Sequence, residues 1–220
     1  SKKMKISVKT LTYMAFLLLV SQIAAGRGSW NGERSKAIAQ MTEESLFREI
    51  SFLSDTLCKG RATGTAGNVD AAFWIKRKFE QAGLKCFGGS YGSHFITPTG
   101  VHAHNVIGML PGALSMPRDR YVIVGAHFDH LGELNGSVYP GADANASGTV
   151  AMTSLADIFG AMREMGKVYD SNILFVAFDA KEMNMAGSDA LWKLIDYGML
   201  KDPVSGAAVS RDKIELMVNI

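Results

Sequence analysis

The chain has 220 residues, enough for one domain with a sizeable core, and its composition is that of an ordinary globular protein. Its formal net charge of +2 depends on four lysines near the N-terminus, and without these four charges the net charge becomes −2. The rest of the chain is slightly acidic, which removes the main argument for nucleic-acid binding.

Residues 1–25 have the pattern of a secretory signal peptide. The four lysines precede the apolar run LTYMAFLLLV, and the small residues of SQIAAG follow it, so we expect cleavage after Ala25. The apolar run is about half of the roughly 20 residues that cross a membrane. We therefore expect export to the periplasm or the exterior without a stable membrane anchor. Residues 26–40 are polar and predict a flexible lead-in to one domain over residues 41–220.

Two segments early in the domain have the apolar periodicity of helices. Residues 42–54 place Leu46, Phe47, Ile50 and Leu53 on one face. Residues 69–84 place a stripe on one face and end at Gly83, which is a natural helix stop. The stripe consists of Val69, Ala72, Phe73, Lys76 and Phe79.

The two cysteines, Cys58 and Cys86, allow a disulfide after export to an oxidising compartment. Their spacing does not show whether their Cα atoms approach, and two buried thiols are an equal alternative. Neither cysteine has a second Cys or His at the spacing of zinc ligands.

The rest of the chain alternates strands and helices. HAHNVIGML and RYVIVGAHF, joined by PGALSMPRD, predict an antiparallel hairpin. Helices over SGTVAMTSLADIFGAMREM and GSDALWKLIDYGML then separate the apolar strands YVIVGA, NILFVAFDA and ELMVNI. This pattern predicts an α/β fold with a mixed, mainly parallel central sheet, an antiparallel hairpin at one side and helices on both faces. A sheet that ends in an open apolar strand at Ile220 predicts a domain that is incomplete at its C-terminus.

Ionisable residues gather at the carboxyl ends of these strands, where such sheets bind ligands. They are His127, Asp129, Asp179 and Glu182. Asp129 lies two residues after His127 in an extended segment, so it could bond the imidazole and fix its tautomer. Each motif also has a structural explanation: a His–Asp pair at a strand end, Glu182 as a helix-start acid, and Asn145 or Ser147 as a helix cap. Their succession at one sheet edge favours a functional site.

The ordered motifs VIVGAHFDH, PGADANASG, FVAFDAKEMNMAGS and MVNI resemble the co-catalytic zinc exopeptidases of the bacterial leucyl aminopeptidase type. Glutamate carboxypeptidase II and glutaminyl cyclase belong to the same family. The resemblance spans residues 52–220 and includes the earlier segments GRATGTAGNVDAAFWIKRKFEQAGL and HNVIGMLPG. It implies a three-layer fold, one or two zinc ions, and a peptide or N-terminal amino acid as substrate. Oligomeric state and side-chain preference stay open.

The resemblance assigns roles to three residues that match the family pattern. His127 matches a ligand of one metal, and Asp129 matches the acid that orients this histidine. Glu182 matches a ligand of the other metal. Two further ligands of the family pattern would follow Ile220.

The chain departs from the family pattern at two positions. Ala144 occupies the position of the acid that normally bridges the two metals. Asp143, just before it, matches an acid that is not normally a ligand, so Asp143 is only a weak candidate to replace the missing metal ligand. Lys181 occupies the position of the general-base glutamate. A catalytic zinc usually keeps three protein ligands, and a charged lysine cannot deprotonate water.

These departures lead to three hypotheses. The first is an exported zinc-dependent aminopeptidase-type hydrolase that is impaired by Ala144 and Lys181. The second is a non-catalytic relative that binds a peptide or a partner without metal. The third is single-zinc acyl transfer of the glutaminyl cyclase kind. A lysine that takes the place of a cation and pairs with Asp143 or Glu182 would keep the charge balance. Desolvation of Lys181, which would make it a base, is the alternative.

Overall fold

The computed structural model describes residues 42–55, 57–112, 119–166 and 169–220. The predicted signal peptide and lead-in lie outside these residues. Within the described residues, no helix is both long enough and apolar enough to cross a membrane.

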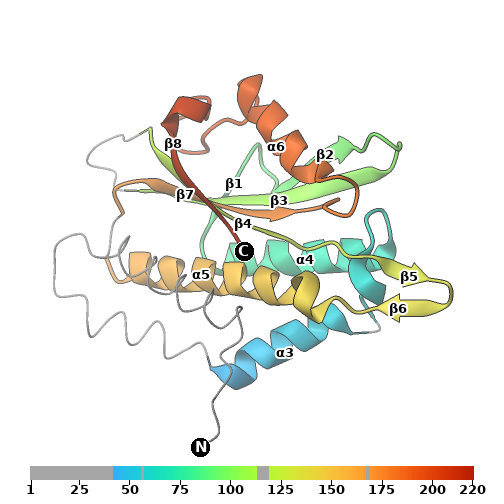
Figure 1. Ribbon diagram of the computed structural model, residues 1–220. Coiled ribbons are helices and arrows are strands. Elements are labelled where there is room, and N and C mark those ends of the chain that lie inside the picture. The colour runs from blue at the N-terminus through green and yellow to red at the C-terminus, as the bar shows by residue number, and fades with distance from the viewer. Residues whose placement is uncertain (1–41, 56, 113–118, 167–168) are drawn as a thin grey trace, which may run out of the picture.

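A six-stranded mixed sheet forms the centre of the molecule (Figure 1). Its strands follow the order β1-β3-β7-β4-β8, and β2 pairs with β3 beside β1. The bounds are β1 Lys85–Cys86, β2 Gly92–Ile96, β3 His102–Leu110, β4 Tyr121–His127, β7 Asn172–Phe178 and β8 Ile214–Asn219. A separate antiparallel pair, β5 Gly132–Leu134 and β6 Ser137–Tyr139, extends from the end of β4.

The sheet pairing corrects one prediction. β3 and β4 do not form a hairpin, because β7 lies between them, antiparallel to β3 and parallel to β4. The antiparallel neighbours of β3 are instead β1, β2 and β7. Among the described strands, parallel pairing is confined to β4 with β7 and β8, so the antiparallel part of the sheet is larger than expected. The crossover from β4 through α5 to β7 brings β7 back beside β4. The connection between β3 and β4, residues 111–120, contains nothing in its sequence that would predict this insertion of β7 between the two strands.

Helices cover both faces of the sheet, which confirms the predicted three-layer α/β fold (Figure 1). Three helices lie on one face: α3 Glu43–Ser54, α4 Ala66–Gln81 and α5 Ser147–Glu164. Of the helices in the described residues, α6 Ala186–Asp196 alone lies on the other face. Short helical turns occur at η1 Lys59–Arg61, η2 Ala142–Ala146 and η3 Arg211–Lys213. Each side has its own apolar core, built around α4 and α5 on one face and around α6 on the other.

The predicted apolar stripe of α4 is wrong in two of its five members. Val69 and Phe73 are 55% and 62% exposed, although Ala72 and Phe79 are fully buried. Thr65 caps the helix, which begins at Ala66, and the buried face consists of Gly67, Asn68, Ala71, Ala72, Ile75 and Phe79. Small residues on this face allow the helix to lie close to its neighbours, so the bulky residues next to them point outward. On α3, Leu53 is buried as predicted and Phe47 is 69% exposed.

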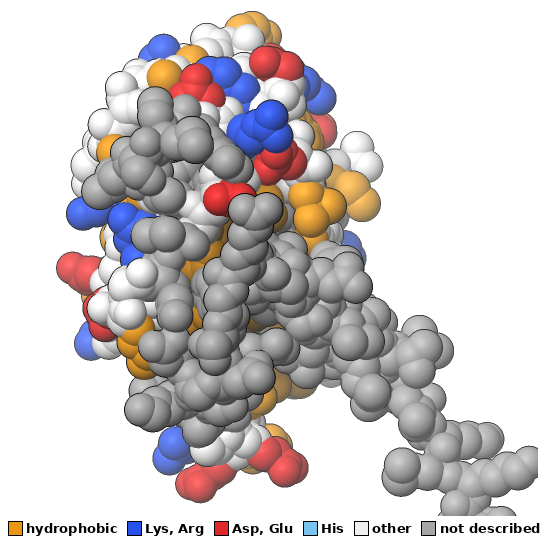
Figure 2. All heavy atoms as spheres, turned by 90° about the vertical axis from the view of Figure 1, so that its left-hand side faces the viewer, with side chains coloured by type: hydrophobic (Ala, Val, Ile, Leu, Met, Phe, Trp, Pro, Cys, Tyr) orange, Lys and Arg blue, Asp and Glu red, His pale blue; other side chains and the backbone are white. Residues whose placement is uncertain are grey.

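Both cysteines are free thiols, Cys58 buried and Cys86 partly buried, so the disulfide that the sequence allowed is not formed in this structure. Figure 2 views the molecule from its left-hand side in Figure 1, away from the carboxyl ends of β4 and β7. On that face, positive and negative side chains of the described residues are interspersed around apolar ones.

Candidate functional site

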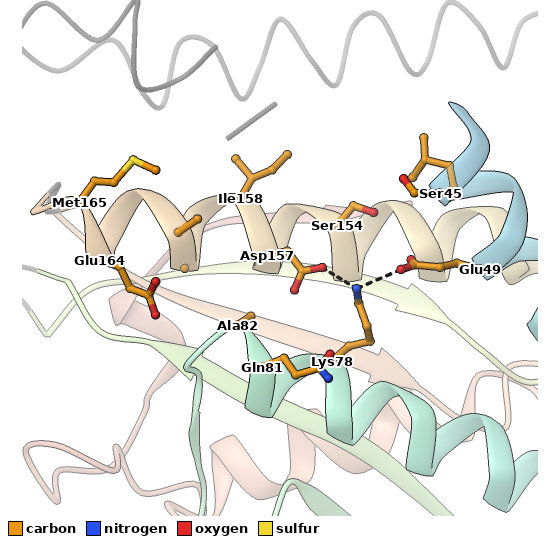
Figure 3. Close-up of a pocket in the computed structure, with 13 residues that line it drawn as sticks. Ser45, Glu49, Lys78, Gln81, Ala82, Ser154, Asp157, Ile158, Glu164 and Met165 are labelled. Carbon is orange, nitrogen blue, oxygen red and sulfur yellow. Dashed lines mark hydrogen bonds and ion pairs between the residues drawn. The ribbon is translucent and has the colours of Figure 1, made fainter. Parts of the chain in front are cut away.

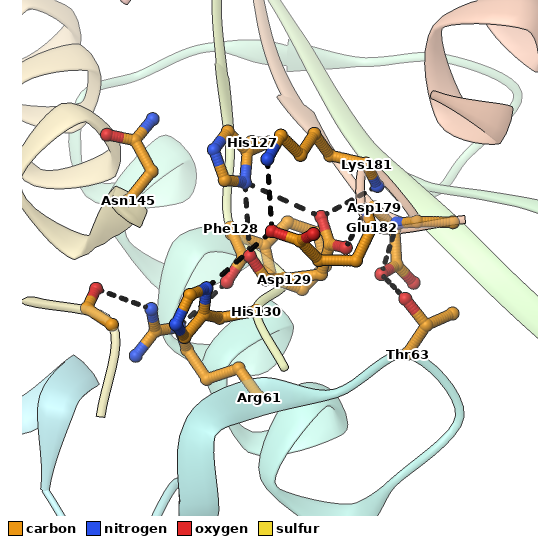
Figure 4. Close-up of polar contacts among 12 residues, drawn as sticks. Arg61, Thr63, His127, Phe128, Asp129, His130, Asn145, Asp179, Lys181 and Glu182 are labelled. Carbon is orange, nitrogen blue, oxygen red and sulfur yellow. Dashed lines mark hydrogen bonds and ion pairs between the residues drawn. The ribbon is translucent and has the colours of Figure 1, made fainter. Parts of the chain in front are cut away.

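The carboxyl ends of β4 and β7 bring the predicted site residues together (Figure 4). His127, the last residue of β4, lies opposite Phe178, the last residue of β7. The pairing continues for one more step, because the amide of Phe128 donates to the carbonyl of Phe178 at 2.9 Å. The loop after β4 and the turn after β7 therefore leave the sheet side by side, which places Asp129 beside Lys181 and Glu182.

Asp129 fixes the turn that carries Lys181 and Glu182. Its carboxylate is completely buried, and it accepts the backbone N–H of Lys181 on Oδ1 and that of Glu182 on Oδ2, both at 3.0 Å. Bonds from backbone N–H groups to an ionised carboxylate are stronger than those between neutral groups. Asp129, which follows β4, therefore holds the backbone from which the Lys181 and Glu182 side chains extend.

The imidazole of His127 lies against the same residue. Its Nδ1 is 3.1 Å from the backbone carbonyl oxygen of Asp129 and 3.7 Å from the carboxylate Oδ1. An Nδ1–H donated to that carbonyl leaves Nε2 as the free acceptor of the ring. The closer contact is with the carbonyl rather than the carboxylate, so orientation of His127 by the Asp129 carboxylate stays a prediction.

The Lys181 ammonium is paired with the neighbouring carboxylate. Its Nζ donates to Oε1 of Glu182 at 3.0 Å, and the Lys181 and Glu182 side chains are 41% and 27% exposed. In Figure 4 the lysine side chain reaches back toward His127, and its ammonium lies above the Glu182 carboxylate. Of the two partners left open by the sequence, Glu182 is the one that the structure places in contact.

His130 approaches the same carboxylate from the other side. Its Nδ1 is 3.7 Å from Oε1 of Glu182 and is a buried nitrogen without a hydrogen-bond partner among the described residues. Burial lowers the pKa of His130, and although the Glu182 carboxylate acts in the opposite direction, the Arg61 charge adds to the lowering. Sequence reasoning assigned no role to His130, because a second histidine after a strand resembles any polar strand end.

Arg61 is a functional-site residue that sequence reasoning missed. Its fully buried side chain donates from Nε to the carbonyl of Phe128 at 2.7 Å and from a terminal nitrogen to that of Gly141 at 3.0 Å. The other terminal nitrogen bonds the carbonyls of Leu53 and Pro140. Burial lowers the pKa of Arg61. The guanidinium therefore ties α3, the loop after β4 and the start of η2 to one point behind the site.

Asp179 belongs to the wall of the site. Its buried carboxylate accepts bonds from Thr63 Oγ1 at 2.9 Å, Asn68 Nδ2 at 2.9 Å and the His104 amide at 3.1 Å. Burial raises its pKa. Because these contacts occupy both oxygens, Asp179 joins the loop before α4 to β3 and β7.

The loop of residues 141–148 contributes less to the site than its sequence suggests. Asn145 accepts the Gly148 amide on Oδ1 at 3.2 Å and donates to the carbonyl of Ile220 at 2.9 Å. The structural alternative is therefore confirmed for Asn145, whose side chain caps the first turn of α5. Asp143 is exposed and Ala144 is half-buried, and Ala144 has only a methyl group to offer.

The residues present do not fit a two-zinc centre. Among the described residues, no group of three His, Cys, Asp or Glu side chains is arranged to hold a metal ion. Glu182 is bonded to an ammonium, and the predicted bridging position has no donor atom. A zinc ion in a catalytic site usually needs three protein ligands.

Two cavities lie away from these residues. One, of about 510 Å³, runs between α3, α4 and α5, where the Lys78 ammonium pairs with Glu49 at 3.0 Å and Asp157 at 2.6 Å (Figure 3). The other, of about 340 Å³, lies between β2 and α6. Neither is lined by His127, Lys181 or Glu182.

Comparison with known proteins relates this geometry to a family. Residues 105–220 match the sequence profile described as Peptidase family M28. The solved structure of LapA from Legionella pneumophila is 17% identical with a TM-score of 0.62, covering 88% of this chain and 47% of that one. LapB from the same organism is 19% identical with a TM-score of 0.57, covering 78% and 44%. A glutaminyl cyclase from Macrostomum lignano is 15% identical with a TM-score of 0.61, covering 89% and 57%. These identities show a shared fold, and the chain spans about half the length of the solved chains.

Proposed function

The chain belongs to peptidase family M28, and from this premise we propose that it is an exported exopeptidase relative whose hydrolytic chemistry is impaired and whose strand-end site binds peptides. The observation that carries the proposal is the Lys181 ammonium at the position of the general base, bonded to Glu182 at 3.0 Å. Zinc dependence, export and the peptide substrate come from the family resemblance and are part of the proposal.

The chemistry of Lys181 supports impairment. A general base must accept a proton from the attacking water, and an ammonium has no lone pair with which to do so. Ala144 adds to the loss, since a methyl group cannot bind a metal ion. The alternative in which Lys181 acts as a base requires a desolvated side chain. The Lys181 side chain is 41% exposed, which does not support this alternative.

The proposal is tested with the purified protein and the double variant Ala144→Asp/Lys181→Glu. Bound zinc is measured by mass spectrometry, and turnover is measured with a panel of aminoacyl-p-nitroanilides at saturating zinc. We expect the unaltered protein to hold well under one zinc per chain and the double variant to gain about 10²-fold or more in turnover, which is the usual contribution of a general base.

A charge-reversal control comes from β1, where Lys85→Glu changes an exposed lysine outside the site and should leave zinc content and turnover unchanged. Near-stoichiometric zinc together with peptide turnover in the unaltered protein would refute impairment. Calorimetric titration with short peptides separates a binding protein from one that has lost both binding and catalysis.

A further inference from the structure

β2 lies at an open edge of the central sheet. Among the described residues it pairs with β3 alone. The carbonyl of Tyr91, just before β2, accepts the amide of Ile107 at 2.7 Å, so every second residue after Tyr91 forms the bonds to β3. Of the residues between them, His94 and Ile96 therefore turn their backbone N–H and C=O groups away from β3. These groups form a free row of donors and acceptors.

This edge lacks the features that usually protect a strand from pairing. Natural edge strands carry lysines, prolines or inward-pointing charges that prevent another strand from joining them. The strand GSHFI contains no proline and no acidic or basic residue other than its histidine. The N–H of Gly92 is taken by the Ser90 hydroxyl at 3.0 Å, at the end of the strand that begins it. An uncharged edge of this kind is a template for a further extended backbone.

A groove beside the edge can receive the side chains of an added strand. The cavity of about 340 Å³ lies between β2 and α6, with Phe95 on one wall and Tyr197 and Met199 on the other (Figure 1). Tyr197 and Met199 are 75% and 63% exposed, so this apolar wall is open to solvent. Asp189 and Lys193 also line the groove, and their opposite charges leave it without net charge. The groove therefore suits an uncharged, apolar side chain.

We propose that the edge of β2 and this groove bind an extended apolar peptide as an additional strand. Backbone hydrogen bonds provide the affinity in this mode of binding, and alternate side chains that enter pockets provide the specificity. The edge leads toward the candidate site, because His104, opposite His94, donates its amide to the Asp179 carboxylate at 3.1 Å. The inference rests on the proposed function in taking peptides as ligands, and it needs neither Lys181 nor Glu182.

The test measures the binding of a heptapeptide of alternating leucine and threonine by fluorescence polarisation. The peptide has an acetylated N-terminus and a C-terminal fluorescein, so it offers no free N-terminal amino acid. Ile96→Pro removes an outward N–H without breaking a bond to β3, and it should weaken binding by about tenfold or more. Ile96→Val is the matched control, because it keeps the N–H and should bind as the unaltered protein does. Ala190→Phe, which fills the groove, serves as a second variant should Ile96→Pro lower the melting temperature.

Hydrogen exchange followed by NMR locates the bound peptide. The amides of His94 and Ile96 should exchange about tenfold more slowly, or less, once the peptide is bound. The same peptide with a fully N-methylated backbone should not bind. Binding that Ile96→Pro and Ala190→Phe both leave unchanged would overturn the proposal. So would protection confined to Lys181 and Glu182.

A second copy of the chain is the other possible occupant of this edge. A dimer of the unaltered protein that Ile96→Pro dissociates, seen by sedimentation, would assign the edge to self-association and overturn the peptide proposal. Because the probe is blocked at its N-terminus and no turnover is measured, failure here rejects only the β2 surface. The zinc and turnover measurements decide the proposed function separately.

Discussion

Replacing Asp129 with Asn tests whether its buried carboxylate holds the site together. The change keeps the shape of the side chain, but its amide can offer an acceptor to only one of the two N–H groups, from Lys181 and Glu182, that the carboxylate now receives. The other N–H group then faces an NH₂ group. A hydrogen bond to a charged group contributes about 1.5–3 kcal/mol, and a buried donor left without a partner costs about 1–3 kcal/mol.

We therefore expect Asp129→Asn to lower the free energy of unfolding by about 3 kcal/mol, measured by urea denaturation at pH 7. The backbone amide proton of Lys181 or Glu182 should also shift upfield in the NMR spectrum, because it loses an ionised acceptor. Asp119→Asn is the control, since Asp119 is half-exposed and pairs with Lys213 on the surface. Its effect should stay within about 0.5 kcal/mol. A loss below about 1 kcal/mol for Asp129→Asn, with unchanged amide shifts, would refute the reasoning.

Three further predictions concern packed residues on either side of the central sheet. Burial lowers the pKa of His104 from 6.5 to about 4, so between these values the unfolded chain binds more protons than the native one and stability falls as the pH falls. Urea denaturation at pH 7 and pH 4.5 should show a loss of up to about 3 kcal/mol that His104→Gln removes. Gly187→Ala should destabilise the fold by about 1–3 kcal/mol in thermal melts, because the new methyl group would meet the Asp179 carbonyl. Lys78→Met should cost about 1–3 kcal/mol at pH 7 and less at pH 4, since burial raises the pKa of the Asp157 carboxyl that faces its ammonium and protonation then removes that negative charge.

Patterns confined to one segment predicted the fold well. The continuous apolar strands and the helices between them gave the three layers, and the ends of β4 and β7 meet where the sequence placed the site. The pairing of β3 failed, because its neighbour β7 lies more than 60 residues later, as in the pair Val106 and Ala177, and neither strand specifies its partner. The predicted apolar face of α4 was wrong because Val69 and Phe73 have helical spacing but lie beside the face that packs, which is made largely of small residues.

The parts of the site that sequence reasoning missed are those whose role depends on burial. Arg61 in a glycine-rich loop looks like a surface arginine until its guanidinium is seen among four carbonyl groups. His130 acquires interest only because its Nδ1 is buried beside Glu182 without a partner. The sequence could not decide whether Asp143 or Glu182 pairs with Lys181, because the family pattern places both acids close to the Lys181 position. The coordinates were needed to make this choice.

Because Arg61 holds both ends of the β5–β6 hairpin, the tip of this hairpin can be replaced by another sequence. The hairpin begins just after Phe128 and ends just before Pro140, and both roots are bonded to the same guanidinium. Gly60 lies beneath it, where any larger side chain would meet the backbone of Tyr139 and Gly132. A designer could therefore swap the tip between Leu134 and Ser137 for longer recognition loops. The grafted sequence would project beside the candidate site while both ends of the hairpin stayed bonded to Arg61.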